Sequence, residues 1–107
     1  MEANPRTVES YIAPNDAIPF DDWMAELKDH KGKTQIERRI NRVRLGLIGH
    51  CRDVGDGVTE LKIDFGPGYR VYCVDDGKTV LLLCGGTKRT QDADIAKAKY
   101  YWREYRS

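Results

Sequence analysis

Hydrophobic side chains recur along this chain with two different periods, and the periods predict seven secondary-structure elements. In segment 58–65, apolar and polar residues alternate, which is typical of a strand with one buried face. In segment 19–29, apolar residues recur three and four positions apart, which is typical of an amphipathic helix. Applied to the whole chain, these criteria predict strand 7–13, helix 19–29, helix 34–48, strands 58–65, 69–74 and 79–84, and helix 90–105.

Turn and capping residues separate these elements. Gly32 is expected to end the first helix, and the pair Asp76-Gly77 predicts a tight hairpin before the last strand. Gly85-Gly86 is expected to stop that strand, and Thr90 is a candidate N-cap for the final helix. The second helix is expected to bury one stripe of side chains, formed by Ile36, Ile40, Val43 and Leu47.

The order of elements, β-α-α-β-β-β-α, predicts an α+β fold with a four-stranded, mostly antiparallel sheet. Strand 79–84 is apolar on both faces, so it is expected to be central and covered on both sides. The first two helices are expected to form a hairpin on one face of the sheet, with the other face left partly open. A length of 107 residues fits one domain, spanning residues 1–107.

The composition indicates a soluble protein, because 40% of residues are hydrophobic and 33% are charged. The N-terminus has no basic stretch followed by an apolar run, and the longest apolar run, 80–84, is too short to cross a bilayer. We therefore expect a cytoplasmic protein with no membrane association.

The formal net charge of +1 hides strong segregation of charge along the chain. Residues 1–32 carry three basic and seven acidic side chains, whereas residues 33–52 carry six basic and one acidic. Residues 53–87 are again acidic, with three basic and six acidic side chains, and residues 88–107 are basic, with six and three. A nearly neutral total therefore remains compatible with a basic surface that binds a polyanion.

The cysteines and histidines do not predict a metal centre or a cofactor. The three cysteines have no CxxC spacing, and Cys73 and Cys84 lie in apolar runs where a thiol behaves as a small hydrophobic group. His30 and His50 fall near predicted helix ends, where imidazolium can complement the helix dipole. No phosphate loop, dinucleotide fingerprint or HExxH motif is present in the sequence.

Basic side chains gather instead around the predicted hairpin and the end of the last strand. Lys62 is expected to point away from the core, and Arg70 follows a glycine turn that lets it reach the same exposed side. Lys88 and Arg89 follow the glycine pair, where the chain leaves the sheet. Such cations can hold RNA phosphates and stabilise charge in a phosphoryl-transfer transition state, although solvated surface cations are the more common case. Further candidates for RNA contact are Arg38, Arg42, Tyr69 and Tyr72, the two tyrosines as aromatic surface.

Two sequence blocks carry a resemblance to a known family. Residues 57–72, GVTELKIDFGPGYRVY, and residues 81–88, LLLCGGTK, resemble the addiction-module killer proteins, and the likeness continues through Gln91, Asp94-Ile95 and Ala98. It also extends to PFDDW at residues 19–23 and so covers most of the chain. These killer proteins form the phage-derived, HigB-like branch of the RelE/ParE superfamily of toxins.

The resemblance implies the β-α-α-β-β-β-α fold and the toxin role in a toxin–antitoxin pair. The implied activity is ribosome-dependent cleavage of mRNA without a cofactor, and the implied partners are the ribosome, mRNA and an antitoxin, often a helix-turn-helix protein. By position, the family's strand arginine corresponds to Arg70, the lysine of the preceding strand to Lys62, and the basic residue after the last strand to Lys88 or Arg89.

The sequence departs from RelE-like nucleases at two places, which keeps other hypotheses open. Glu60 stands where some of these nucleases have a second lysine, and the region around Asp94-Ile95 has neither the tyrosine nor the histidine used for acid–base chemistry. The first alternative is a non-enzymatic, ParE-like inhibitor of DNA gyrase. The second is a binding protein whose basic helix, Arg38 to Arg44, contacts an acidic partner.

Overall fold

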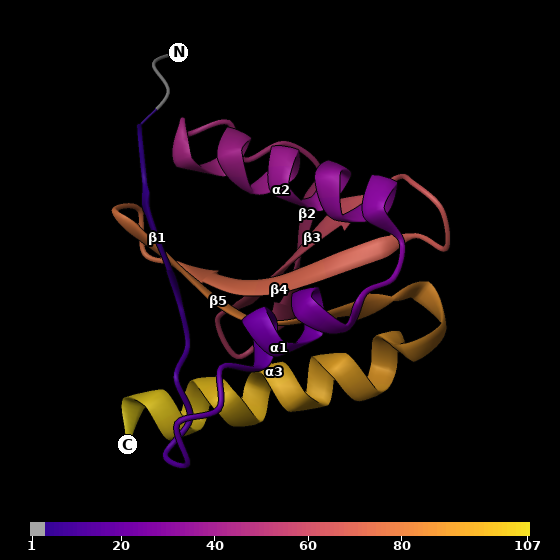
Figure 1. Cartoon of the computed structure of the whole chain (residues 1–107). Helices are drawn as coiled ribbons and strands as arrows, with labels where there is room; N and C mark the ends of the chain where they lie inside the picture. Colours follow the sequence, from indigo (N-terminus) through magenta and orange to yellow (C-terminus); the bar gives the residue numbers. More distant parts are fainter. Residues whose placement is uncertain (1–3) are drawn as a thin grey trace.

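Strand β5 (Thr79–Thr87) lies between β1 and β4 and is buried on both faces in the computed structural model, which describes residues 4–107. It belongs to a five-stranded mixed sheet in the order β1-β5-β4-β3-β2 (Figure 1). The short strand β1 pairs in parallel with β5, and the other neighbours are antiparallel. The remaining strands are β1 (Thr7–Ser10), β2 (Cys51–Gly55), β3 (Val58–Ile63) and β4 (Tyr69–Asp75).

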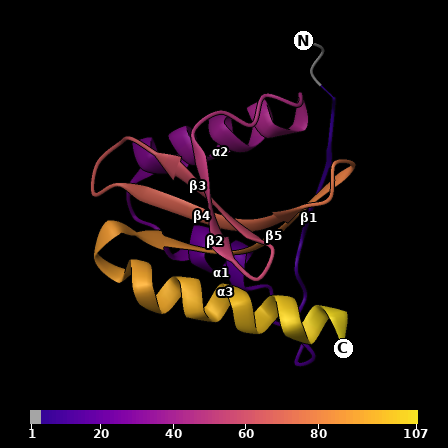
Figure 2. The same cartoon turned by 180° about the vertical axis from the view of Figure 1, so that it is seen from behind.

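Helices cover both faces of this sheet. Helices α1 (Pro19–Glu26) and α2 (His30–Arg44) pack on one face, and α3 (Gln91–Arg106), preceded by the short helix η1 (Lys88–Thr90), packs on the other (Figures 1 and 2). Our expectation that the second face is partly open is therefore wrong. The second face is closed because the stripe of α3 around Ala98 covers the buried side chains of Val58, Tyr72 and Leu83 and forms a second core with them.

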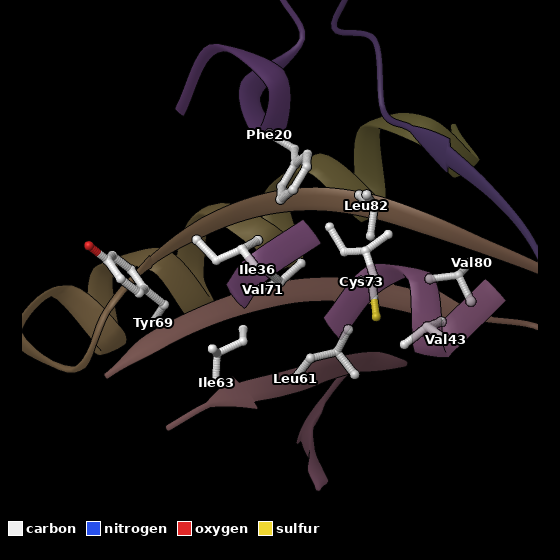
Figure 3. Close-up of a cluster of buried hydrophobic side chains, with 11 residues drawn as sticks. Phe20, Ile36, Val43, Leu61, Ile63, Tyr69, Val71, Cys73, Val80 and Leu82 are labelled. Carbon is white, nitrogen blue, oxygen red and sulfur yellow. The ribbon is translucent and has the colours of Figure 1, made fainter. Parts of the chain in front are cut away.

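The larger core lies between the sheet and the first two helices (Figure 3). Ile36 of α2 is fully buried there, and Val71 of β4 and Val80 of β5 face the same layer. Phe20 contributes from α1. Val80 and Leu82 of β5 enter this core, and Leu81 and Leu83 enter the second core, which confirms that the apolar character of both faces reflects a strand covered on both sides.

The fifth strand, β2, is a correction to the predicted four-stranded sheet. Its segment, Cys-Arg-Asp-Val-Gly, carries two charged side chains and is exposed or half-buried throughout. An edge strand needs only one hydrogen-bonded neighbour, and β2 pairs with β3 from Cys51 opposite Leu61 to Gly55 opposite Val58. Without an alternating apolar pattern, such a strand has no strong signal in the sequence.

The start of α2 is also displaced from its predicted position. Asp29 caps the helix by accepting a 2.9 Å hydrogen bond from the backbone N–H of Gly32, so the helix begins four residues before Thr34. Gly32 lies in the first turn instead of ending α1, and α2 ends at Arg44. Leu47, expected in the buried stripe, lies beyond the helix and is exposed.

The predicted stop at Gly85-Gly86 is in fact a site of close packing within β5. A Cβ on Gly85 would lie 2.3 Å from the Trp23 ring of α1, and one on Gly86 would lie 1.8 Å from Oδ2 of Asp94 in α3. The strand therefore continues to Thr87 because two helices approach its backbone from opposite faces. Between residues 4 and 107, no helix has the length and apolar character that a membrane span requires.

Candidate functional site

A hollow of about 290 Å³ opens where β2, β3 and β4 meet the start of α3. We call it the strand hollow, and its lining residues are His50, Cys51, Arg52, Glu60, Lys62, Arg70 and Gln91. Three of these side chains are cations and one is a carboxylate, so the strand hollow has the charge expected for binding an anionic group.

Lys62 and Arg70 are brought together here, as the sequence predicted. They are register partners on the antiparallel strands β3 and β4 and point into the same hollow. The Lys62 side chain is 38% exposed, and its ammonium lies 3.5 Å from the exposed carboxylate of Asp64. An ion pair between such exposed groups is weak, so Lys62 remains able to bind an external anion.

Arg70 differs from expectation because only 5% of it is exposed. Its Nη1 donates a 2.6 Å hydrogen bond to the carbonyl of Gly68, and its Nε lies 3.9 Å from Oε2 of Glu60. The cause is α3, which covers this face of the sheet and makes position 70 the floor of the strand hollow. The prediction that Arg70 is exposed is wrong. Arg70 and Lys62 do line one hollow, whereas Lys88 and Arg89, which were expected to converge with them, line a different one.

Glu60 is the centre of a hydrogen-bond network in the strand hollow, and only 3% of it is exposed. Its Oε1 accepts a 2.9 Å hydrogen bond from Nε of Arg52. Its Oε2 accepts from the Tyr72 hydroxyl at 3.0 Å and from Nε2 of Gln91 at 2.9 Å. Burial by itself would raise the pKa of Glu60, but the hydrogen bonds from these three partners outweigh it and hold the pKa below its ordinary value. The carboxylate is therefore ionised at neutral pH.

The two tyrosines do not provide the exposed aromatic surface that the sequence suggested. Tyr72 is fully buried in the second core, and Tyr69 is 3% exposed and donates a 2.7 Å hydrogen bond to Asp29. Burial, followed by the charge of Glu60, raises the pKa of Tyr72, and burial with the Asp29 hydrogen bond raises the pKa of Tyr69 to about 12. Both hydroxyls stay protonated and act as structural donors.

Lys88 and Arg89 lie exposed on η1, directly after β5. The backbone N–H of Lys88 donates to the Gly68 carbonyl at 2.9 Å, and this is the same oxygen that accepts from Arg70. The structure thus places the backbone of Lys88 beside Arg70. The side chains of Lys88 and Arg89 line a second hollow, of about 350 Å³, that shares Gln91 with the strand hollow.

Arg38 and Arg42 are exposed on α2 and line a third hollow, of about 550 Å³, which we call the helix hollow. It shares His50 and Lys62 with the strand hollow, so the two form one continuous basic region. Arg39 fixes the boundary between them, because its guanidinium donates to the backbone carbonyls of Lys62 at 3.3 Å and His50 at 2.7 Å. Burial lowers the pKa of Arg39, consistent with this structural position.

Sequence reasoning predicted only Lys62 and Arg70 among the seven lining residues of the strand hollow, and it missed the three that form its hydrogen-bond network, Arg52, Glu60 and Gln91. Arg52 lies on the unrecognised strand β2, and Gln91 was noted only as part of the family resemblance. Glu60 was assigned to an exposed face because its strand alternates, yet α3 covers that face. The parity of β3 did contain a usable signal, since it places Glu60 and Lys62 on the same side of the strand.

The three cysteines are not grouped with other potential metal ligands within residues 4–107. Cys73 and Cys84 are buried, Cys51 is half-buried, and all three are free. Burial raises the pKa of both the Cys73 and Cys84 thiols to about 12, which makes them unreactive. Within residues 4–107, no group of three His, Cys, Asp or Glu side chains has the arrangement needed to hold a metal ion.

Comparison with known proteins places this chain in a family. The model of the family described as Phage derived protein Gp49-like (DUF891) matches residues 22–103, which include all lining residues of the strand hollow. A Haemophilus influenzae protein, described as uncharacterized, is 47% identical over 88 residues, covering 81% of this chain and 89% of the relative. No solved structure matches the chain significantly. The extent of the family match shows that this chain belongs to the Gp49-like family of phage-derived proteins.

Proposed function

We propose that this protein is the toxin of a type II toxin–antitoxin system and that it cleaves mRNA on the ribosome, blocking translation. Its Gp49-like family is a family of RelE- and HigB-like addiction-module toxins, which supports the toxin role in general. The observation that carries the nuclease hypothesis is the convergence of Lys62 and Arg70, register partners on β3 and β4, in one hollow with Arg52.

The chemistry assigned to the strand hollow is phosphate binding and charge stabilisation. The RNA's own 2′-hydroxyl loses its proton to water and attacks the adjacent phosphorus, the bond to the 5′-oxygen breaks, and that oxygen takes up a proton from water, which leaves a 2′,3′-cyclic phosphate and a 5′-hydroxyl. In the transition state the phosphate carries additional charge on its non-bridging oxygens. Lys62 is exposed enough to contact these oxygens, and Arg70 provides a fixed positive charge beneath them. Removing one preorganised donor from such a site typically costs about 3 kcal/mol of transition-state stabilisation.

The flanking cations are assigned to the remainder of the RNA. Arg38 and Arg42 of the helix hollow would bind phosphates on one side of the scissile bond, and Lys88 and Arg89 would stabilise charge on the other. Contacts of this kind position a nucleic acid without reading its sequence. The proposed partners are therefore the ribosome with its mRNA, and an antitoxin, of the helix-turn-helix type, that restrains the toxin in the cytoplasm.

The test is induction of the protein without its antitoxin, with mapping of mRNA ends and measurement of DNA supercoiling within minutes. The proposal predicts growth arrest and discrete breaks within translated codons. Lys62→Ala is the informative variant, because Lys62 is half-exposed and its loss should leave the fold intact. We expect cleavage to fall by about 10²–10³-fold.

Lys78→Ala is the matched control, since Lys78 is an exposed lysine in the β4–β5 turn, outside the three hollows. It should retain full toxicity. Intact messages in arrested cells would refute the nuclease proposal, and normal growth of cells that accumulate the wild-type protein would refute the toxin proposal.

A non-enzymatic inhibitor of DNA gyrase is the second candidate. The specific observation that favours it is the Glu60 carboxylate, which lies inside the strand hollow and partly neutralises Arg52 and Arg70. In the same experiment, gyrase-linked DNA damage with intact messages would support this candidate.

A further inference from the structure

We propose that Glu60 is a positioning residue of the strand hollow, which fixes Arg52 and Arg70 in one arrangement and links it to α3. This inference rests on the proposed function, because it assigns a role within the same phosphate-binding site. It concerns a carboxylate that, at first sight, opposes the binding of an anion.

The partners of Glu60 come from three different elements. Its two oxygens accept hydrogen bonds from Arg52 on β2, Tyr72 on β4 and Gln91 on α3, at 2.9–3.0 Å. Arg70 on β4 completes the set, with its Nε 3.9 Å from Oε2. One side chain on β3 therefore determines how the two neighbouring strands and the start of α3 present their polar groups.

Stability alone does not explain a carboxylate at this position. Its side chain is 4% exposed and lies beside the second core, in contact with the fully buried Tyr72. A buried ion pair is often no more stabilising than a well-packed apolar side chain of similar size, because desolvation of the charges offsets their attraction. A buried Arg70, however, needs an opposite charge, so Glu60 allows a cation to form the floor of the strand hollow.

The contacts of Arg70 show how strongly its position depends on Glu60. Its Nη1 has one hydrogen bond, to the Gly68 carbonyl, and its buried Nε has none. Its other polar contact within residues 4–107 is the 3.9 Å ion pair with Glu60. Arg52 also depends on Glu60. Its side chain is 57% exposed, so few neighbours pack against it, and its Nε donates a hydrogen bond to the Glu60 carboxylate.

This arrangement predicts opposite effects on binding and on chemistry when the charge of Glu60 is removed. The negative charge weakens the attraction of the strand hollow for RNA phosphates, so its loss should leave RNA affinity unchanged or increase it. The same loss releases two arginines, and mobile donors stabilise a transition state less well than preorganised ones. A purely structural role would instead lower both quantities together.

The experiment compares Glu60→Gln with the wild type in two assays. Affinity for a fluorescently labelled RNA oligonucleotide is measured by anisotropy, and single-turnover cleavage is measured on programmed ribosomes. We expect affinity that is equal or higher and cleavage that is at least about tenfold slower. Glu104→Gln is the charge-matched control, because Glu104 is exposed thirteen residues along α3 from Gln91, about 20 Å away, and should change neither value.

A readout that needs no activity separates this inference from the proposed function. The Nε–H signals of Arg52 and Arg70 in nitrogen-15 NMR spectra should be distinct in the wild type and should broaden or exchange faster in Glu60→Gln. If the wild type neither binds nor cleaves RNA, the proposed function fails and these signals still test the positioning role. Unchanged arginine signals, or a parallel loss of affinity and cleavage, would overturn it.

Tyr72→Phe covers the case in which Glu60→Gln does not fold. This variant removes one hydrogen bond from Oε2 and keeps the carboxylate. We expect unchanged RNA affinity, a two- to fivefold loss of cleavage and a smaller change in the arginine signals. Wild-type cleavage together with unchanged arginine signals would contradict the positioning role.

Discussion

The indole ring of Trp23 occupies the space into which a side chain on residue 85 would project. A Cβ on Gly85 would lie 2.3 Å from the ring carbons Cε3 and Cζ3, which is well inside van der Waals contact. Trp23 also packs against Phe20 and Tyr69, with ring centroids 5.9 and 6.1 Å away. The glycine therefore allows α1 to approach the central part of the sheet.

The first prediction follows from this contact. Gly85→Ala should destabilise the protein by about 1–3 kcal/mol, because the aromatic cluster must move to accommodate a methyl group. Urea unfolding measures the change. Gly77→Ala is the control for sterics, since no atom lies within 4 Å of its Cβ and only the backbone cost of its φ of +90° remains. Equal midpoints for Gly85→Ala and wild type would show that α1 packs differently.

The second prediction concerns Arg70, whose burial changes how a substitution must be interpreted. Arg70→Ala removes a buried charge from beside Glu60 and should destabilise the fold. A loss of toxicity in that variant could therefore come from unfolding or from loss of the proposed phosphate-binding charge. Arg70→Lys keeps the charge. We expect it to fold but to lose toxicity, because a single ammonium does not reproduce the fixed geometry of a planar guanidinium. Growth after induction and the thermal midpoint measure the two effects, and full toxicity would remove Arg70 from the proposed site.

The third prediction concerns the thiols. Burial holds the pKa of Cys73 and Cys84 at about 12, so both should resist iodoacetamide at pH 8 in the native protein, whereas the half-buried Cys51 should react. Intact-mass measurement should show one adduct under native conditions and three in guanidinium chloride. Rapid addition of three adducts to the native protein would mean that β4 and β5 open easily.

The fourth prediction is loss of stability in acid. The pKa of Glu60 is lowered by its hydrogen bonds despite burial, and that of Asp29 is lowered chiefly by the Gly32 N–H and then by Tyr69. A carboxylate whose pKa is lower when folded contributes stability above its unfolded pKa and loses it as pH falls through the folded pKa. The ordinary values are 4.5 and 3.8, so the thermal midpoint should be constant near neutrality and fall below about pH 4.5.

The raised pKa of Tyr69 predicts that stability also declines at high pH. Its pKa is raised to about 12 from 10, so the stability it contributes is present below pH 10 and is lost as pH rises towards 12. Asp29→Asn should make both limbs shallower, since it removes the carboxylate and the charge beside Tyr69. A pH dependence identical to the wild type in this variant would contradict the Asp29–Tyr69 hydrogen bond.

The sequence by itself determined the elements whose side chains repeat with a regular period. The alternation in 58–65 located β3, the helical stripe of Ile36, Ile40 and Val43 located α2, and the two apolar faces of 79–84 identified the strand that is covered on both sides. Lys62 and Arg70 were predicted to converge because Lys62 points away from the core and Arg70 follows a glycine turn that lets it reach the same side, and the antiparallel register of β3 and β4 places them opposite each other.

The tertiary structure decided which of these side chains are exposed and what they contact. Strand parity assigns Glu60, Lys62 and Arg70 to a face of the sheet, but only the packing of α3 on that face determines that Glu60 and Arg70 are buried while Lys62 remains accessible. Burial depends on the neighbours that folding brings together. The local pattern of β3 and β4 does not show on which face of the sheet α3 packs, although α3 itself was predicted. The strand hollow and its central carboxylate therefore emerge only when β2, β3, β4 and α3 are assembled.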